Sequence, residues 1–427
     1  MSIEDEIAAA LELQQHGRTE EALDCCLSLL TKESSDFRVH FLAGILFQQF
    51  ENTPPAISHF SKAVELCPDL APAHYNLGVL HFSEGKMEPA AESYRRAAEL
   101  APDDPDVFFN LALTLKNMGR YPESKNNYGK VLAINPGDTD AHYNLGVLLR
   151  EMDEPEEAIG SFEKAISLSP SHLAARKHLA SLFHLLGHRE KALAAYQSIL
   201  ALDPANESAL HMTAALAGET PDTPPLSYVQ ELFDRFSDRY EKTMGEKLES
   251  NIEKQLRDML DSHCGGLRFA RGLDMGCGTG LSGLALKDRV RHFTGIDLSA
   301  GMLAQAREKK IYQEVAQNDI VSFLEKGDVF YDFFLAADVF VYLGDLRPIF
   351  SLVRKKAHPG ACFVFSSETC GQGFLLQESG RYAHAEKYIR ELAEQCGFSI
   401  NCCRPARLRK EKGEWISGNL YLLTVAT

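Results

Sequence analysis

Eight residues near the middle of the chain combine three glycines with an acidic side chain. They read Leu273-Asp-Met-Gly-Cys-Gly-Thr-Gly280. Closely spaced glycines let the backbone turn tightly and bring bare N–H groups to a ligand at the start of a helix. The overlapping string Gly278-Thr-Gly-Leu-Ser-Gly283 is a formal G-x-G-x-x-G, and Asp297 follows at the distance expected of a ribose-binding carboxylate. These residue types therefore suit the binding of a nucleoside-containing cofactor.

The acidic residue of this loop separates two kinds of cofactor. Asp274 suits a ligand that carries an ammonium and no phosphate, because a carboxylate beside a pyrophosphate would be repelled. The longer string Asp274 to Gly280 resembles motif I of S-adenosylmethionine-dependent methyltransferases. Further stretches follow in the order of that family: Gly295-Ile-Asp-Leu-Ser299, Asn318-Asp-Ile320, Ala337-Asp-Val339 and His358-Pro-Gly-Ala361. Their order favours a methyltransferase over a dinucleotide-dependent dehydrogenase.

The resemblance implies S-adenosylmethionine as the cofactor and a role for each matching residue. Asp297 is expected to accept both ribose hydroxyls, and the stretch around Asp319 to bind the adenine amino group and ring. Aromatic residues of the helix before the first strand are expected to fold over the cofactor. The implied contacts are Asp274, Gly276, Cys277, Gly278, Gly280, Asp297, Leu298, Asp319, Ile320, Ala337 and Tyr240.

Simpler structural roles stand beside these. Asp297 and Asp319 can each cap the helix that follows, and the glycines can form a turn without a ligand. Cys277 is expected to be a small filler and not a nucleophile, since no base neighbours it in the sequence.

Methyl transfer asks little acid–base chemistry of the protein. The sulfonium already activates the methyl group, so holding the acceptor close in a dry pocket can contribute ~7–11 kcal/mol. Only a weak nucleophile also needs a base. The candidates are Tyr342, Glu368, Tyr382 and His384, the last on an expected helix, and Arg381 could anchor a substrate carboxylate. O-, N- and C-methylation stay open.

The elements around these residues alternate between strand and helix. Strands are expected at 269–275, 292–296, 312–316, 328–337 and 361–367, with helices at 282–288, 300–309 and 346–356 between them. Two further helices, through 229–240 and 248–260, precede the first strand. This alternation predicts an α/β, doubly wound, Rossmann-like sheet. Residues 398–404 and 419–425 flank a polar loop and match the C-terminal antiparallel hairpin of class I methyltransferases.

The first half of the chain is periodic. Prolines recur every 34 residues, with a small residue 24 positions and an aromatic residue eight positions before each, which places close-packed helix pairs between successive prolines. The pattern resembles the tetratricopeptide repeat over about residues 3–217, with about six repeats. The first repeat is degenerate and has Ser34 in place of the proline, and residues 207–217 form a capping helix. The prolines are Pro68, Pro102, Pro136, Pro170 and Pro204.

Asparagines recur on the first helix of three successive repeats, at Asn76, Asn110 and Asn144. On the concave face each would offer donors and an acceptor to an extended peptide backbone. They resemble the peptide-gripping ladder in the repeats of protein O-GlcNAc transferase. A surface role that only stabilises the helices is the alternative, since Ala43 and Lys177 nearby show that the outer repeats do not keep this lining.

Composition limits the remaining possibilities. The net charge of −16 disfavours a nucleic-acid partner, and the sequence has neither a span-length apolar run nor zinc-ligand cysteine spacing. We therefore expect a cytoplasmic protein without a metal, in which residues 1–217 form the repeats, 218–225 a proline-rich linker and 226–427 the methyltransferase domain. This combination resembles a group of bacterial repeat-containing methyltransferases. The repeats are expected to recruit a protein or peptide; a small-molecule methyltransferase with repeats for assembly and a catalytically idle scaffold are the alternatives.

Overall fold

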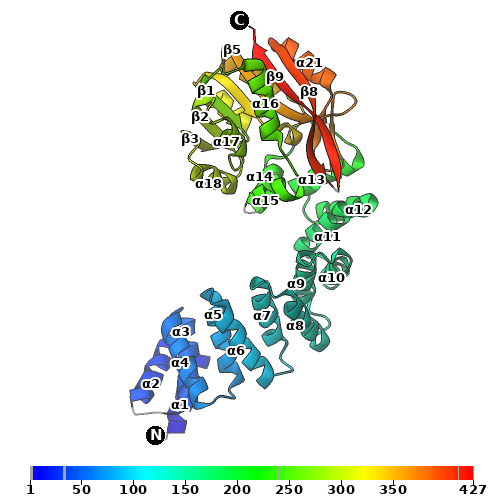
Figure 1. The fold of residues 1–427 in the computed structure, drawn as a ribbon. Helices are drawn as coiled ribbons and strands as arrows, with labels where there is room; N and C mark the ends of the chain where they lie inside the picture. Colours follow the sequence, from blue (N-terminus) through cyan, green and yellow to red (C-terminus); the bar gives the residue numbers. More distant parts are fainter. Residues whose placement is uncertain (1–2, 32–34, 238–239, 412, 427) are drawn as a thin grey trace. The chain divides into compact units, whose positions relative to one another are not determined.

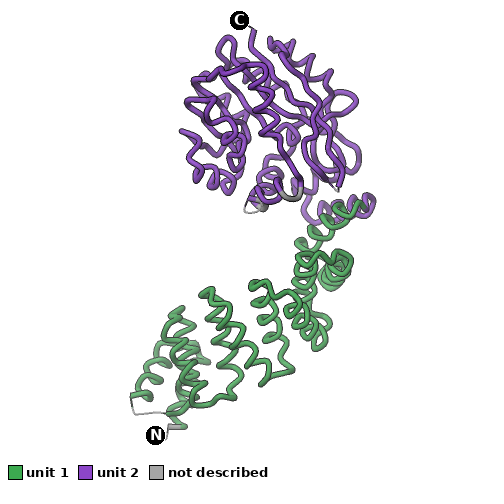
Figure 2. Tube along the Cα trace, in the orientation of Figure 1, with its two compact units in different colours: residues 1–187 green, residues 188–427 purple. Residues whose placement is uncertain are grey.

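A computed structural model describes residues 3–31, 35–237, 240–411 and 413–426. The chain divides into two compact units, residues 1–187 and residues 188–427, which Figure 2 colours separately. The predicted Ser34 lies outside the described residues. The sequence predicts that the repeats end at residue 217. The boundary between the units falls earlier, so the helices that continue the repeat pattern beyond residue 188 belong to the second unit.

The first unit consists of helices packed as successive antiparallel pairs (Figure 1). Each predicted proline lies two residues beyond the last residue of a second helix, as at Leu66 and Pro68, because proline cannot continue the hydrogen-bond ladder. The helices are α1 (Ile3–Gln15), α2 (Thr19–Thr31), α3 (Phe37–Gln49), α4 (Thr53–Leu66), α5 (Ala71–Ser83), α6 (Met87–Leu100), α7 (Pro105–Asn117), α8 (Tyr121–Ile134), α9 (Thr139–Glu151), α10 (Pro155–Leu168) and α11 (Leu173–Leu185).

Small residues set how closely the helices of a pair approach. A Cβ atom added at Gly78 would lie 2.6 Å from the ring of Tyr94, a distance at which something must shift. The same holds between Gly44 and Phe60, at 2.7 Å. The aromatic side chains are fully buried in the grooves that the glycines leave open. This confirms the predicted pairing of small and aromatic residues.

The second unit begins with helices and continues as an α/β fold. Its helices are α12 (Arg189–Leu202), α13 (Glu207–Ala217), α14 (Leu226–Phe236), α15 (Tyr240–Lys242), α16 (Ile252–Cys264), α17 (Leu281–Leu286), α18 (Ala300–Glu308), α19 (Ile320–Lys326), α20 (Arg347–Lys356) and α21 (Glu386–Gln395), with a π-helical turn η2 (Thr243–Lys247) and a 3₁₀ turn η3 (Phe340–Tyr342).

One seven-stranded sheet organises this unit, in the order β3-β2-β1-β4-β5-β9-β8. The first five strands are parallel and were all predicted; β9 and β8 add the predicted antiparallel hairpin, with longer strands than expected. The strands are β1 (Phe269–Met275), β2 (Val290–Asp297), β3 (Glu314–Gln317), β4 (Tyr331–Ala336), β5 (Ala357–Glu368), β8 (Phe398–Glu411) and β9 (Glu414–Val425).

A separate two-stranded ribbon pairs β6 (Phe374–Leu376) with β7 (Tyr382–His384). The helix expected around His384 is therefore wrong. The segment pairs as a strand because Ser379-Gly380 makes a turn, with Gly380 at φ +79°, that folds residues 382–384 back on β6.

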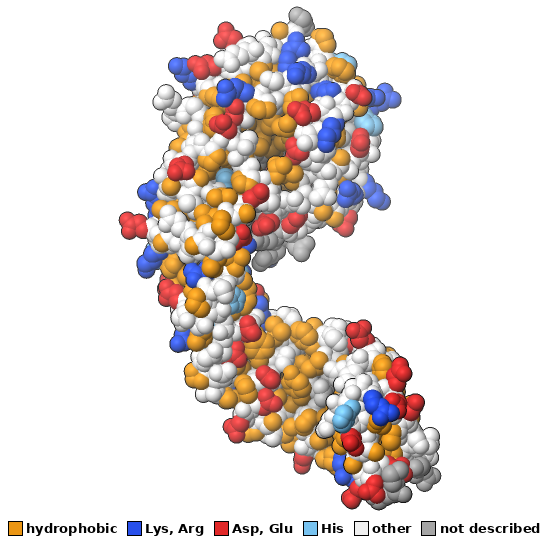
Figure 3. All heavy atoms as spheres, turned by 180° about the vertical axis from the view of Figure 1, so that it is seen from behind, with side chains coloured by type: hydrophobic (Ala, Val, Ile, Leu, Met, Phe, Trp, Pro, Cys, Tyr) orange, Lys and Arg blue, Asp and Glu red, His pale blue; other side chains and the backbone are white. Residues whose placement is uncertain are grey.

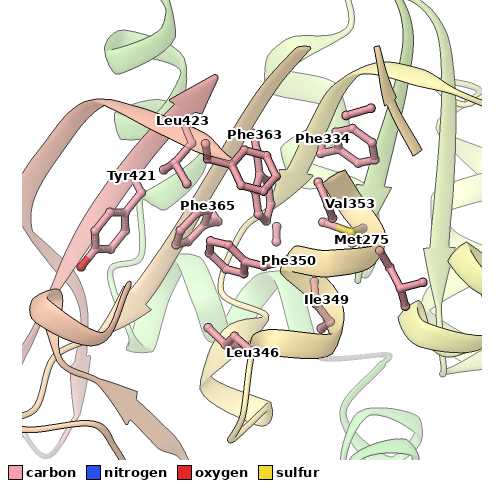
Figure 4. Close-up of a cluster of buried hydrophobic side chains, with 14 of the residues drawn as sticks. Met275, Phe334, Leu346, Ile349, Phe350, Val353, Phe363, Phe365, Tyr421 and Leu423 are labelled. Atoms are coloured by element: carbon pink, nitrogen blue, oxygen red, sulfur yellow. The ribbon is translucent and has the colours of Figure 1, made fainter. Parts of the chain in front are cut away.

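Apolar side chains cover both faces of the main sheet. Figure 4 shows one face, where Phe350 and Val353 of α20 pack against Phe363 and Phe365 of β5. On the other face, Leu256 and its neighbours on α16 pack in a second cluster with residues of β1, β4 and β5. Both faces are therefore buried, as a doubly wound sheet requires.

The predicted linker, residues 218–225, packs against the methyltransferase half of its unit. The backbone oxygen of Asp222 accepts a hydrogen bond from the Asp345 N–H at 2.7 Å, and the Pro221 oxygen accepts one from the Tyr382 hydroxyl at 3.0 Å. On α13, His211 Nε2 lies 2.9 Å from the Gly380 oxygen. Residues 188–225 therefore contact the ribbon and the loop before α20.

Charged side chains of both signs share the surface (Figure 3), and the cysteines form no disulfides. On the face seen in Figure 3, Lys and Arg side chains are mixed with Asp and Glu. All ten cysteines are free. Among the described residues, no helix has the length and apolar character to cross a membrane, and no His, Cys, Asp and Glu side chains gather in a group that could hold a metal.

Candidate functional site

The glycine loop directly follows β1 and adopts a backbone that other residues avoid. Gly276, Gly278 and Gly280 have φ values of +73°, +53° and +91°. A Cβ atom at Gly276 would lie 2.6 Å from Cγ2 of Val339, just beyond β4. The turn therefore favours all three glycines, and the close approach of the loop to Val339 additionally requires Gly276.

Asp297, the last residue of β2, connects the loop to the next strand. Its Oδ2 accepts a hydrogen bond from the Gly278 N–H at 2.9 Å, and its Oδ1 accepts one from the Ser299 N–H at 2.9 Å. Each carboxylate oxygen can accept a further hydrogen bond, so a diol remains a possible ligand. Burial raises the pKa of Asp297, and the backbone donors oppose that shift.

Asp274 is fully buried within β1. Its Oδ2 accepts hydrogen bonds from Ser282 Oγ at 2.9 Å and from the Tyr312 hydroxyl at 2.7 Å, whereas Oδ1 has no partner among the described residues. Burial raises its pKa to about 7. An unpaired buried oxygen is costly, and a ligand donor or an ordered water would satisfy it.

A cavity of about 320 Å³ opens at the carboxyl ends of β1, β2 and β4. This volume lies within the range of small-molecule sites. Its lining includes nine of the residues predicted from the sequence: Tyr240, Gly276, Gly278, Asp297, Leu298, Asp319, Ile320, Ala337 and Tyr342. Asp274, Cys277, Gly280, Glu368 and His384 do not line it.

Three aromatic residues meet at this cavity. The ring of Phe233 on α14 lies 5.0 Å from that of Tyr342 and 6.3 Å from that of Tyr240, both edge to face. Burial raises the pKa of Tyr240 well above its usual value. Phe233 and Tyr240, on the helices that precede β1, thus line the cavity where the family resemblance implied aromatic residues. The side chain of Phe236 lies outside the described part.

Two of the candidate bases are engaged elsewhere. Glu368, at the end of β5, forms an ion pair with Arg409, and burial raises its pKa against the effect of that arginine. His384 is fully buried, its Nε2 lies 2.9 Å from the Gly344 oxygen, and burial lowers its pKa to about 4. Both side chains therefore serve internal contacts, whereas Tyr342 lines the cavity.

Sequence reasoning missed several residues of this site. Thr223 and Pro224, from the expected linker, line the cavity. Asp338 stands in a stretch that the family resemblance had singled out, but no role was predicted for it, and it lines the cavity as well. Arg409 on β8 binds Asp338, 71 residues away in the sequence. Proline-rich composition predicts a turn and not a wall, and no local pattern predicts an ion pair between distant strands.

The charges of the cavity discriminate between cofactors. Its lining contains the carboxylates of Asp297, Asp319 and Asp338 but, among the described residues, no lysine or arginine. A pyrophosphate would meet these carboxylates without a compensating cation, whereas a cationic cofactor suits them. This acidic lining fits the cofactor that the motifs implied.

The predicted asparagines lie on α5, α7 and α9 and are half-buried. The side-chain amides of Asn76, Asn110 and Asn144 each donate to the carbonyl four residues earlier, at 2.9 Å. Asn110 also donates to the Tyr75 hydroxyl at 3.1 Å. These bonds hold each amide in place and leave the acceptor oxygens for a ligand.

Family models match both halves of the chain. A model described as a methyltransferase domain matches residues 273–360, and tetratricopeptide-repeat models match residues 71–104, 93–126 and 139–172. The chain contains tetratricopeptide repeats and a methyltransferase domain. The predicted fold, a repeat solenoid followed by a Rossmann-like methyltransferase domain, is confirmed.

Two of the curated relatives are methyltransferases. The malonyl-[acyl-carrier protein] O-methyltransferase of Salmonella typhimurium is 29% identical over 167 residues, covering 38% of this chain and 63% of that enzyme. Its counterpart from Serratia marcescens is 28% identical over 168 residues, covering 39% and 63%. The structure of YrrB, described as a TPR protein with an unusual peptide-binding site, is 28% identical and covers 40% of this chain and 88% of its own, with a TM-score of 0.38. The chain thus spans less than two thirds of these curated relatives.

Proposed function

We propose that this protein is an S-adenosylmethionine-dependent methyltransferase whose repeats recruit a protein or peptide. The observation that carries the first part is the cavity, which combines the glycine loop, Asp297, Asp319 and Asp338 and has no lysine or arginine among its described lining residues. The acid-lined wall suits the sulfonium and ammonium of S-adenosylmethionine and opposes a dinucleotide. The methyltransferase domain match over residues 273–360 supports the same cofactor.

Several residues of the cavity would bind particular parts of this cofactor. Asp297 accepts the ribose hydroxyls, Asp319 and the Ile320 N–H bind the adenine, and the Gly276 to Gly280 backbone accommodates the amino-acid end. When bound, the cofactor supplies an electrophilic methyl group. Phe233, Tyr240 and Tyr342 exclude water and fix the approach of the acceptor, so the protein acts mainly through proximity.

The proposal for the repeats rests on the asparagines. Asn76, Asn110 and Asn144 recur at one helical position in three successive repeats, and their amides are pre-positioned by their own helices. A pre-positioned acceptor loses little conformational entropy on binding a peptide N–H. Recruitment of a protein or peptide is therefore favoured over an assembly role alone.

Calorimetric titration tests the cofactor assignment. We expect the full chain to bind S-adenosylmethionine and S-adenosylhomocysteine and not NAD. Asp297→Ala should weaken both by roughly 10-fold to over 100-fold, because charge-assisted hydrogen bonds are worth ~1.5–3 kcal/mol each.

The control is Asp328→Asn, which removes an exposed carboxylate outside the cavity. It should bind as the unmodified protein does. An Asp297→Ala protein with unchanged affinity would remove the ribose assignment, and binding of NAD alone would overturn the proposed cofactor.

A further inference from the structure

Asp338 lies in the cavity wall with an unusual backbone. It is two residues beyond the end of β4 and has φ +56°, a left-handed conformation that residues other than glycine seldom adopt. Its N–H donates a hydrogen bond to Ser366 Oγ on β5 at 2.8 Å, which holds this conformation. Uncommon backbone conformations of this kind cluster at functional sites.

The side chain of Asp338 is held at one oxygen only. Arg409 Nη1 donates to its Oδ1 at 2.8 Å. Its Oδ2 has no hydrogen-bond partner among the described residues, and Asp338 lines the cavity with a side chain that is 13% exposed. One oxygen is thus fixed by the protein, and the other remains to accept a bond from a ligand.

The surrounding charges leave an excess of carboxylate. Arg409, only 1% exposed, also pairs with Glu368 and Glu411. Arg381 pairs with Glu411 and lies with Cζ 6.0 Å from the centre of the Tyr342 ring. The cluster thus contains the three carboxylates of Asp338, Glu368 and Glu411 and two guanidinium groups. Its formal charge is −1 when all five groups are ionised.

The sheet order places Asp338 away from the nucleoside end of the proposed cofactor. Asp297 and Asp319 follow β2 and β3, on one side of β1, whereas Asp338 follows β4, on the other side. Its neighbour Val339 contacts the glycine loop at Gly276. A cofactor with its ribose on Asp297 therefore directs its reactive end toward Asp338 and Tyr342.

We propose that Asp338 Oδ2 binds the acceptor by taking a hydrogen bond from its nucleophilic N–H or O–H, so that the substrate is an amine or a hydroxyl compound. This inference rests on the proposed function. A carboxylate acceptor carries no such proton and would face Asp338 with like charge.

The transfer balances with this assignment. The lone pair of the acceptor nitrogen or oxygen forms a bond to the methyl carbon. The sulfur–carbon bond breaks, its electron pair stays on sulfur, and S-adenosylhomocysteine is formed. The proton that the acceptor loses passes to the Asp338 carboxylate and from there to solvent. Arg409 is a positioning residue, because it holds Asp338 Oδ1 and does not line the cavity.

The test uses a cofactor analogue, so that no acceptor is needed. In sinefungin a carbon that bears an amino group replaces the methyl-bearing sulfonium, and this amino group takes the direction of transfer. We expect the full chain to bind sinefungin roughly tenfold or more tightly than S-adenosylhomocysteine, through a charge-assisted bond to Asp338. Asp338→Asn should abolish this preference while S-adenosylhomocysteine binds within about threefold of the unmodified protein.

Two further variants control the result. Asp338→Gly removes the carboxylate and suits the left-handed backbone, so it should also lose the preference if Asp338→Asn does not fold. Asp328→Asn, exposed before β4, should keep it.

Each outcome is decisive. A sinefungin preference that survives in Asp338→Asn or Asp338→Gly would overturn the inference. If the Asp338 variants bind sinefungin and S-adenosylhomocysteine equally more weakly, Asp338 contacts a part common to both analogues. The inference that it binds the acceptor would then be overturned as well. If the unmodified protein binds neither analogue, the proposed function itself fails and this inference fails with it.

Discussion

At the scale of single residues, the buried Asp274 carboxyl makes stability depend on pH. Its pKa is about 7 in the folded protein, against a usual value of 3.8. Between these values the folded chain keeps a proton that the unfolded chain has lost, so the free energy of unfolding falls as pH rises. The stabilising effect of this proton is complete below the unfolded pKa and is lost as pH rises through about 7.

We therefore predict that Asp274→Asn gains stability relative to the unmodified protein as pH rises from about 4 to about 7. Asparagine has the same shape and no proton to lose in this range. Chemical denaturation of both proteins at several pH values measures the difference in unfolding free energy. A difference that does not change with pH would show that Asp274 titrates normally.

Residues in local motifs were predictable, whereas residues joined by long-range contacts were not. Asp297 and the glycine loop stand in short strings whose turn chemistry is visible in the sequence. Asp338 and Arg409 meet only because β9 pairs with β5 and β8 with β9, in a register that includes bulges in β8. Glu368 looked available for catalysis because the sequence could not reveal its arginine partner.

At the scale of elements, the asparagines on α5, α7 and α9 predict a peptide-binding face. A hydrogen bond to each would contribute ~0.5–1.5 kcal/mol, so replacing Asn76, Asn110 and Asn144 by alanine should weaken partner capture by about one to three orders of magnitude. Cofactor affinity should not change. Affinity capture on the repeats supplies the partner, and its binding to both proteins is then titrated.

Asn126→Ala is a suitable control, since Asn126 is exposed on α8, a second helix. If the triple variant binds and methylates the partner as efficiently as the unmodified protein, the asparagines do not bind the partner and only stabilise the helix surface. The repeats would then be assembly modules.

The regular elements followed from periodicity, and the irregular ones did not. Repeat helices and parallel strands bury apolar faces at fixed spacing, which the sequence displays. The β6–β7 ribbon is three residues long on each side, too short for a period to register. Its pairing depends on the turn at Gly380. The sequence does not reveal that turn, which is why the prediction for His384 is a helix and not a strand.

At the scale of the whole molecule, the boundary between the units predicts which fragment folds. The sequence placed an independent domain at 226–427, but Thr223 and Pro224 line the cavity and Pro221 accepts the Tyr382 hydroxyl bond. We predict that residues 188–427 fold and bind S-adenosylmethionine as the full chain does. The shorter fragment should be less stable, since one buried group left without its partner costs ~1–3 kcal/mol.

Thermal unfolding and calorimetry of the two fragments decide between the boundaries. If residues 226–427 are as stable and bind as tightly as residues 188–427, then α12 and α13 belong with the repeats and residues 218–225 are a linker, as the sequence suggested.

Methyl transfer to a protein in lysate tests the central claim most directly. The full chain is incubated in lysate with an S-adenosylmethionine analogue that carries a transferable alkyne, and labelled proteins are separated by size. The account predicts labelled protein bands that are absent with Asp297→Ala and weaker with the triple asparagine variant. Formation of S-adenosylhomocysteine from S-adenosylmethionine in lysate without any labelled protein would contradict recruitment of a protein, and neither product nor label would contradict the methyltransferase itself.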